Sequence, residues 1–339
     1  MKRLVLTGAV LALVLAAPAA AAGSWAQPQI KLVTARGLMG GSAAAFRPDD
    51  ALTAGDLNGL VAGLTGRPAA AAAASSGVPV TIAQLDAQLV RALGLLPTAR
   101  QLTASLRAAG LVPTSYFGTE TVARLLGLRV NHPTALDSLE LGPENVATRA
   151  EAAYSAARIL SFPAGEADAI ARLAATFRPP PLGGFQRTVL QTAVSLVGYP
   201  YVWGGTSELP QNPFGQPTQV PGGFDCSGFA WRVYKLQGYP GAGALPGVLR
   251  GRTTYAMAAE VPPAKRIPLM KVVPGDLLFF GSAGPRSKPA QIDHMGIYLG
   301  AGWFVQSSEQ GVALAPLTPD WYGKRFAWAR RPLAEAGLL

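Results

Sequence analysis

The sequence predicts an α+β protein, in which an antiparallel sheet packed with helices follows a mostly helical first half. Three observations lead to this prediction. Apolar residues recur at helical spacing in the first half, as at Leu85, Leu89 and Leu93. A stretch rich in Pro and Gly, residues 177–184, then interrupts the pattern. Beyond it, residues 293–300 alternate between apolar and other side chains, as a half-buried strand does.

Composition limits the possible functions. The chain has 339 residues, of which 49% are hydrophobic, so it is long enough for two domains with cores. Its net charge of +10 comes from singly scattered Lys and Arg without aromatic interleaving, which argues against nucleic acid and suits an anionic polymer such as a cell-wall glycan. With one Cys, two His and no clustered carboxylates, we expect no metal, no cofactor and no internal disulfide.

Residues 1–26 have the three parts of a secretory signal peptide. A basic start, residues 1–3, precedes an apolar run and then small residues, so cleavage after Ala22 or Ala26 is expected. The apolar run, residues 4–16, is shorter than the roughly 20 residues that a membrane span needs, which disfavours an anchor. We therefore expect an exported protein, extracellular or associated with the cell envelope, with no membrane contact after signal removal.

Residues 27–176 are predicted to form a helical repeat domain. Thr53, Thr81 and Thr148 each precede an acidic or amide side chain by three residues, which is the spacing of a capping box at a helix start. His132 lies in a turn-like context before a Pro, so we interpret it as a packing or surface residue rather than a ligand.

Residues 177–184 are predicted to be a linker, because consecutive prolines make its first part stiff and the glycines that follow make the chain flexible. The domain that follows, residues 185–339, opens with an amphipathic helix over residues 185–197. A long loop over residues 207–223, rich in Pro and Gln, is expected beside the functional site. A Pro-Gly turn then leads into an apolar strand over residues 277–280.

Cys226, the single cysteine, is a candidate nucleophile at the predicted start of a helix. Asp225 before it suits the N-cap of a helix that ends near Gly238. The free N–H groups and positive dipole end of that helix would lower the thiol pKa, as a nucleophile requires. The alternative is a small buried core thiol.

His294 on the predicted strand supplies a candidate general base. If residues 300–302 form a three-residue hairpin loop, Leu299 faces Trp303 and Gln306 faces Gly296. His294 and Gln306 then share one sheet face, where the amide can orient the imidazole. A two-residue loop would place them on opposite faces, and we predict the three-residue register because a triad needs it.

Four motifs, in this order, resemble the NlpC family of papain-like cysteine peptidases over about residues 185–332: Tyr201 to Gly205, Asp225 to Phe229, Pro274 to Leu277 and His294 to Gly300. The resemblance implies a papain-like domain that hydrolyses amide bonds of peptidoglycan stem peptides, most often between D-Glu and the diamino acid. It also implies that Cys226 is the nucleophile, His294 the base and Gln306 the third polar residue.

The same resemblance implies substrate contacts. Tyr201 would supply a hydroxyl near the oxyanion or the substrate, and Asp225 and Ser227 would contact the free amine of a peptide. Two positions depart from the pattern: Gln306 stands where most members have His, and Met257 stands where Gln is expected.

The first half resembles the S-layer homology repeat. A Gly-containing turn at residues 37–41, a Phe-x-Pro at residues 46–48 and the Thr-Arg-Ala-Glu tetrad at residues 148–151 carry the likeness. It implies a wall-binding region over residues 30–160 that contacts anionic wall polymers. In the other two units, Ala54 and Ile82 stand at the position of the tetrad Arg. The alternative to a wall-binding region is a helical spacer that only positions the second half of the chain.

Taken together, the motifs predict an exported peptidoglycan hydrolase that works through a thioester intermediate. Two alternatives stay open. The first is an N-acetylmuramoyl-L-alanine amidase, which would use the same Cys226 and His294. The second is a catalytically silent wall-binding protein.

Overall fold

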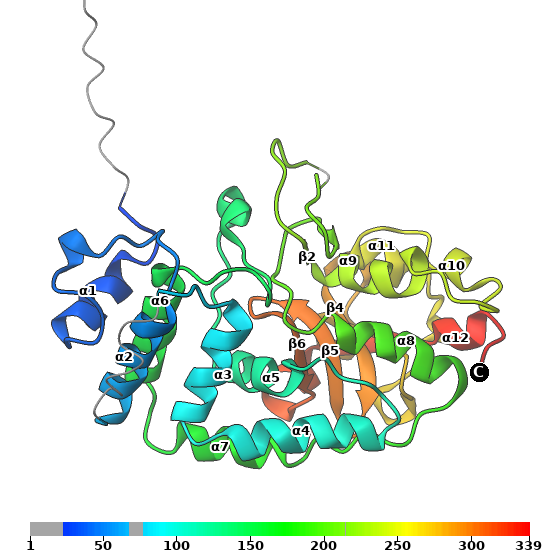
Figure 1. Ribbon diagram of the computed structural model, residues 1–339. Helices are drawn as coiled ribbons and strands as arrows, with labels where there is room; N and C mark the ends of the chain where they lie inside the picture. The colour runs from blue at the N-terminus through cyan, green and yellow to red at the C-terminus, as the bar shows by residue number, and fades with distance from the viewer. Residues whose placement is uncertain (1–22, 68–76, 214) are drawn as a thin grey trace, which may run out of the picture.

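The computed structural model describes residues 23–67, 77–213 and 215–339. Most of the predicted signal peptide, residues 1–22, lies outside this part of the chain. Figure 1 shows a central antiparallel sheet with the helices of the first half to its left and beneath it, and the helices of the second half to its right. Within the described ranges, the helices are all too short or too polar to cross a membrane.

The first half is helical, as predicted. Its helices are α1 (Gln27–Ala35), α2 (Ala54–Thr65), α3 (Ile82–Ala92), α4 (Leu96–Ala108), α5 (Phe117–Leu125), α6 (Arg149–Leu160) and α7 (Glu166–Ala174). A short 3₁₀ segment, Thr134–Leu139, lies between α5 and α6. The buried side chains of α3 include Leu85 and Leu89, which confirms the apolar periodicity read from the sequence.

The second half combines helices and strands. Its helices are α8 (Gly184–Ser195), α9 (Cys226–Trp231), α10 (Leu245–Val248), α11 (Thr254–Ala259) and α12 (Pro332–Glu335). Its strands are β1 (Thr206–Ser207), β2 (Gly223–Phe224), β3 (Leu277–Gly281), β4 (Ile292–Gly300), β5 (Trp303–Ser308), β6 (Gly311–Pro316) and β7 (Phe326–Arg330). The five longer strands form an antiparallel sheet in the order β6-β5-β4-β3-β7, which confirms the predicted α+β fold.

The three predicted helix starts meet at one junction. Leu52 N–H donates to Ala147 O at 2.8 Å, Val80 N–H donates to Leu52 O at 2.9 Å, and Ala147 N–H donates to Val80 O at 2.9 Å. These three bonds close a ring, because each segment donates to one neighbour and accepts from the other. The residue after each is the Thr that caps α2, α3 or α6. The three units are therefore arranged about a local pseudo-threefold axis.

The capping residues behave as the spacing predicts. Thr53 and Thr81 form complete capping boxes with the third residue of their helices. Thr148 accepts the N–H of Glu151, but the Glu151 carboxylate turns away to Arg129, 3.4 Å distant. The S-layer-type repeat stays a prediction, since the ring shows only that three helix starts are equivalent.

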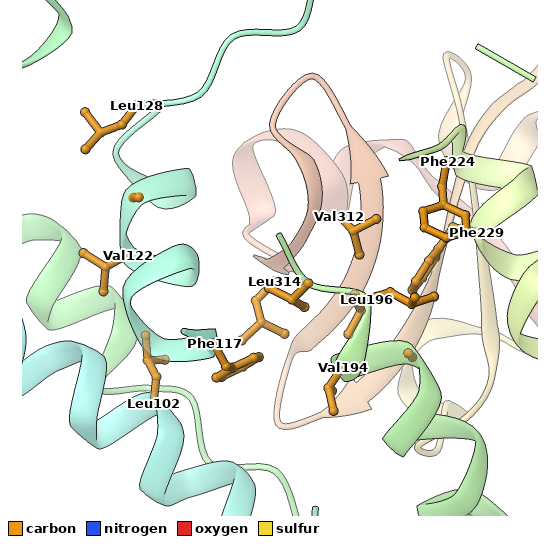
Figure 2. Packing of buried hydrophobic residues seen from close by; sticks show 14 of the residues in the cluster. Leu102, Phe117, Val122, Leu128, Val194, Leu196, Phe224, Phe229, Val312 and Leu314 are labelled. Carbon is orange, nitrogen blue, oxygen red and sulfur yellow. The ribbon is translucent and has the colours of Figure 1, made fainter. Parts of the chain in front are cut away.

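The hydrophobic core runs across both halves of the chain. Figure 2 shows Phe117 of α5 beside Leu314 of β6, and the two belong to one buried cluster. The Arg124 guanidinium donates to the backbone carbonyls of Gly198 and Gln310, in the second half. Leu182 N–H, in the predicted linker, donates to Ala109 O at 3.0 Å. The predicted domain limits stay a prediction, but the two halves share one interior.

Charged side chains are buried where the halves meet. Arg124 lies 3.2 Å from Glu120, and Arg129 lies 3.0 Å from Asp86. Burial, together with the nearby Asp86 charge, raises the pKa of Glu120 to about 8, although Arg124 and Arg129 oppose the shift. At neutral pH burial therefore favours the protonated form of the Glu120 carboxyl.

Candidate active site

Cys226 begins α9, where the sequence predicted a helix start. The Asp225 side chain accepts the Gly228 N–H and so acts as the N-cap. Because α9 packs against β4 and β5, the thiol is directed at the sheet and is only 8% exposed. The Sγ atom lies 3.3 Å from Thr254 Oγ1 and within hydrogen-bonding range of the Met295 N–H. The thiol therefore lies against the residue that follows His294.

The expectation of a lowered thiol pKa is wrong for this structure. Burial, followed by the charge of neighbouring Asp225, raises the pKa of Cys226 to about 11. Hydrogen bonds from Thr254 and from the Met295 and Ser227 N–H groups act in the opposite direction but are outweighed. The helix start alone cannot compensate, because the thiol has lost nearly all of its contact with water. The resting thiol is therefore neutral.

His294 and Gln306 lie on neighbouring strands with the predicted pairing. Gly296 faces Gln306 across β4 and β5, so His294 and Gln306 are diagonal neighbours on one face. The hairpin differs in detail from the prediction. Gly300, not Leu299, faces Trp303, and a bulge at Leu299 shifts the register. The turn is thus one residue shorter than predicted, and the bulge restores the same pairing at the site.

A chain of hydrogen bonds fixes the imidazole of His294. The Tyr322 hydroxyl accepts the Gln306 amide Nε2–H at 2.7 Å. This contact turns Gln306 Oε1 toward His294, where it lies 2.5 Å from Nε2. Because a carbonyl oxygen only accepts, the proton of the neutral imidazole is on Nε2 and the lone pair is on Nδ1. The ring also stacks on Phe280, with centroids 5.8 Å apart.

The imidazole of His294 is a neutral base at rest. Burial lowers its pKa below the ordinary value of 6.5, even though the Gln306 hydrogen bond and the Asp293 charge act to raise it. With a neutral imidazole and a neutral thiol, the resting site is not a thiolate–imidazolium pair.

Tyr201 lies at the same site. Burial, followed by the ionised form of Cys226 and by Asp225, raises the pKa of its phenol well above the usual range, so the hydroxyl keeps its proton. Tyr201 also pairs with Phe224 in a parallel bridge just before α9. The structure therefore brings together Tyr201 and the nucleophile candidate, and it leaves the phenol as a hydrogen-bond donor.

Asp225 and Ser227 form a compact cluster with Arg252. Ser227 Oγ–H donates to Asp225 Oδ1 at 2.9 Å, and Arg252 Nη1 donates to Ser227 Oγ at 2.8 Å. Arg252 also contacts both Asp225 oxygens at 3.3 Å, and Gly204 N–H donates to Asp225 Oδ2 at 3.0 Å. Asp225 is thus already engaged by several donors, and its predicted contact with a peptide amine would be an addition to these bonds.

Sequence reasoning missed three residues of the site. Thr254 contacts the thiol, Arg252 braces Asp225, and Tyr322 holds Gln306. The first two stand together after the nucleophile helix, whereas nothing in the sequence links Tyr322 to position 306. Met257, where a Gln was expected, is fully buried in α11, so no polar contact is available there.

The first half also reaches the site. Asp137 is 2% exposed, and its Oδ2 accepts Trp203 N–H at 3.0 Å and Gln216 Nε2–H at 2.6 Å. It thereby ties the long loop to the segment that carries Tyr201. His132 is also buried, beside Glu140 and Trp25, which confirms its interpretation as a packing residue. Over the described ranges, His, Cys, Asp and Glu form no group of three suited to a metal ion.

Fold and site together define an α+β domain with a buried Cys at a helix start and a His–amide pair on the adjoining strands. Residues 198–331 match the family model described as NlpC/P60 family. The C-terminal half of the chain therefore contains an NlpC/P60 domain, as the sequence motifs predicted.

Three curated relatives match the same half. The gamma-D-glutamyl-L-lysine dipeptidyl-peptidase of Bacillus subtilis is 33% identical over 154 residues, which are 45% of this chain and 43% of that protein. A probable endopeptidase of Mycobacterium tuberculosis is 33% identical over 42% of this chain and 29% of its own length. The murein DD-endopeptidase of Escherichia coli is 30% identical over 45% of this chain and 48% of its own length. Each match spans less than half of the relative.

Proposed function

We propose that the protein is a peptidoglycan hydrolase that cleaves the stem-peptide amide bond between D-Glu and the diamino acid. The NlpC/P60 domain and relatives named as a glutamyl-lysine dipeptidyl-peptidase and a murein endopeptidase support the reaction class. The observation that carries the proposal is the hydrogen-bond chain that holds the Nε2 proton of His294 and leaves Nδ1 as a base, beside the strand residue that the thiol contacts.

In the first step, His294 Nδ1 takes the proton of the Cys226 thiol as sulfur attacks the amide carbonyl carbon. A C–S bond forms, and the carbonyl electron pair moves onto oxygen. Transfer and attack occur together because the thiol pKa, about 11, makes a free thiolate rare at neutral pH. The protonated Tyr201 hydroxyl is placed to donate a hydrogen bond to the oxyanion.

In the second step, the oxyanion collapses and the C–N bond breaks. The imidazolium gives its Nδ1 proton to the departing amine, which leaves a thioester on Cys226. Water, deprotonated by His294, then attacks the thioester carbonyl. The thiolate leaves and takes the proton from the imidazolium, so the products are the original thiol and a carboxylic acid, which ionises in water. Gln306 accepts the Nε2–H throughout and holds the ring orientation.

Export and wall attachment belong to the same proposal. The basic and apolar start of the chain supports export, and the net charge of +10 supports contact with an anionic wall polymer. Arg149 is the arginine of the Thr-Arg-Ala-Glu tetrad, and it is only 8% exposed. Its guanidinium donates hydrogen bonds to Asp56 and to Phe46 O, each at 2.9 Å, so it is already engaged within the fold. We therefore assign polymer contact to the scattered surface cations rather than to Arg149.

The test is digestion of purified peptidoglycan, followed by mass analysis of the released fragments. The mature protein should release truncated stem peptides, whereas Cys226→Ala and His294→Ala should release none. The His294→Ala variant keeps the thiol, so its failure would show that the base is needed as well. Circular dichroism checks that both variants stay folded.

Each other outcome decides against part of the proposal. Release of whole stem peptides would identify an amidase that cuts between muramic acid and L-Ala. Equal release by Cys226→Ala would remove the cysteine mechanism. No release from walls of any cross-link type, with Cys226 also unreactive toward an alkylating thiol probe, would identify a silent wall-binding protein.

A further inference from the structure

A short turn of the first half reaches the segment that carries Tyr201. The turn is the 3₁₀ segment Thr134–Leu139, and Figure 1 shows it projecting beside the loop that leads to β2. Its ends are fastened by Glu140, whose carboxylate accepts the His132 N–H at 2.6 Å and lies 3.1 Å from His132 Nδ1. Asp137 therefore belongs to a closed turn rather than to a free loop.

Asp137 and Gln216 form a ring of hydrogen bonds with the backbone of Trp203. Asp137 Oδ2 accepts the Trp203 N–H at 3.0 Å and Gln216 Nε2–H at 2.6 Å. Gln216 Nε2 also lies 3.3 Å from Trp203 O, so both polar groups of Trp203 are held. Asp137 is only 2% exposed, so water does not readily replace the acceptor if the carboxylate is removed.

The next amide along the chain bonds a second carboxylate. Gly204 N–H donates to Asp225 Oδ2 at 3.0 Å, and Asp225 caps α9, which begins at Cys226. One carboxylate from the first half and one from the start of α9 therefore hold two consecutive amides, an arrangement that we call the 203–204 clip. Tyr201 lies only two residues before the clip, so the clip fixes the backbone that carries the phenol relative to α9.

Asp137 is also near the phenol of Tyr201. Burial is the main cause of the raised pKa of that phenol, and the charge of Asp137 adds to the effects of Cys226 and Asp225. Because packed interiors transmit displacement, a shift of the backbone at residues 201–204 moves the Tyr201 hydroxyl relative to the thiol.

We propose that Asp137 is a positioning residue for the proposed hydrolysis, which keeps the Tyr201 hydroxyl aligned with Cys226 through the 203–204 clip. It acts through the backbone of Trp203 rather than at the thiol. The inference rests on the proposed function, because the hydroxyl affects the rate only if it donates to the oxyanion. The oxyanion forms after the substrate has bound, so lost alignment lowers kcat and leaves KM nearly unchanged.

The first test measures peptide hydrolysis by two variants of Asp137. Asp137→Ala removes the acceptor of two hydrogen bonds and should lower kcat about tenfold or more. Asp137→Asn keeps a carbonyl oxygen for the same donors and should restore kcat to within about threefold of wild type. Glu144→Ala is the matched control: Glu144 is an exposed carboxylate in the same connection between α5 and α6, and its loss should change neither kcat nor KM.

A double-mutant cycle separates positioning from a general loss of stability. Tyr201→Phe removes the hydroxyl and keeps the ring, so adding Asp137→Ala to it should lower kcat by less than about twofold more. Losses that multiply would show that Asp137 acts on the rate by another route and would overturn the proposal. An Asp137→Ala kcat within about twofold of wild type would overturn it as well.

Hydrogen exchange tests the clip without turnover. The Trp203 and Gly204 amides should exchange about tenfold faster in Asp137→Ala than in wild type, and near the wild-type rate in Asp137→Asn. Alkylation of Cys226 by iodoacetamide should not change, because Asp225 caps α9 through Gly228. Unchanged exchange in Asp137→Ala would overturn the clip.

The two measurements together distinguish the inference from the function on which it rests. If the wild-type protein cleaves no wall peptide yet exchange responds to Asp137→Ala, the proposed hydrolysis fails while the clip stands. If cleavage is normal and neither exchange nor kcat responds to Asp137→Ala, the positioning role fails while the hydrolysis stands.

Discussion

Replacing Gln306 with Ala tests the hydrogen-bond chain that orients the His294 imidazole. The change removes the acceptor 2.5 Å from His294 Nε2 and leaves the imidazole N–H unsatisfied in a partly buried position. An unsatisfied buried donor costs about 1–3 kcal/mol. If the lost hydrogen bond destabilises the reactive orientation of the imidazole by this amount, kcat should drop by about 5-fold to 150-fold, since about 1.4 kcal/mol is a factor of ten.

Peptide hydrolysis measured across pH checks this prediction in two ways. The Gln306 hydrogen bond acts to raise the His294 pKa, which burial already holds below 6.5. Without that bond the pKa falls further, so the acid limb of the rate profile should move to lower pH even as the maximum rate falls. Tyr322→Phe keeps Gln306 but removes its 2.7 Å partner, and should cost about fivefold for the loss of about 1 kcal/mol. A Gln306→Ala rate within about twofold of wild type, at an unmoved acid limb, would refute the reasoning.

Two further predictions concern ionisable groups. Thr254→Val removes the hydroxyl that lies 3.3 Å from Cys226 Sγ. Because that hydrogen bond lowers the thiol pKa, alkylation of the thiol by iodoacetamide at mildly alkaline pH should slow severalfold in the variant. An unchanged alkylation rate would contradict the contact. Glu120→Gln concerns stability: its raised pKa of about 8 favours the folded state fully at acid pH, and this contribution is lost as pH rises through that value. The urea midpoint of the wild-type protein should therefore fall from about pH 6 to about pH 9, and Glu120→Gln should flatten the fall; parallel curves for both proteins would place the titration elsewhere.

The sequence predicted the elements of the site better than its electrostatics. Periodicity placed Cys226 at a helix start and put His294 and Gln306 on one sheet face, because alternation and pairing are local properties. It did not predict the Leu299 bulge, which exchanges one turn residue for one unpaired strand residue. The thiol pKa was also wrong, because burial of Cys226 depends on how α9 packs against the sheet, and local sequence does not record that packing.

Contacts between residues that lie far apart along the chain could not be predicted from the sequence either. Tyr322 reaches Gln306 from a π-helical turn, Pro319–Gly323, whose sequence carries no catalytic motif. The same holds for the ring of backbone bonds through Leu52, Val80 and Ala147. Capping-box spacing identified three helix starts, yet their convergence on one axis follows from packing across 95 residues rather than from any single segment.

The arrangement of the two halves bears on how specificity would arise. Asp137 accepts the Trp203 N–H, close to the segment that carries Tyr201, and Arg124 lines a cavity beside His294. Both come from the first half, which shares a core with the second half through Phe117 and Leu314. A shared core fixes these walls relative to Cys226, because packed interiors transmit displacement rather than absorb it. The helical half therefore contributes residues to the surface around Tyr201 and His294.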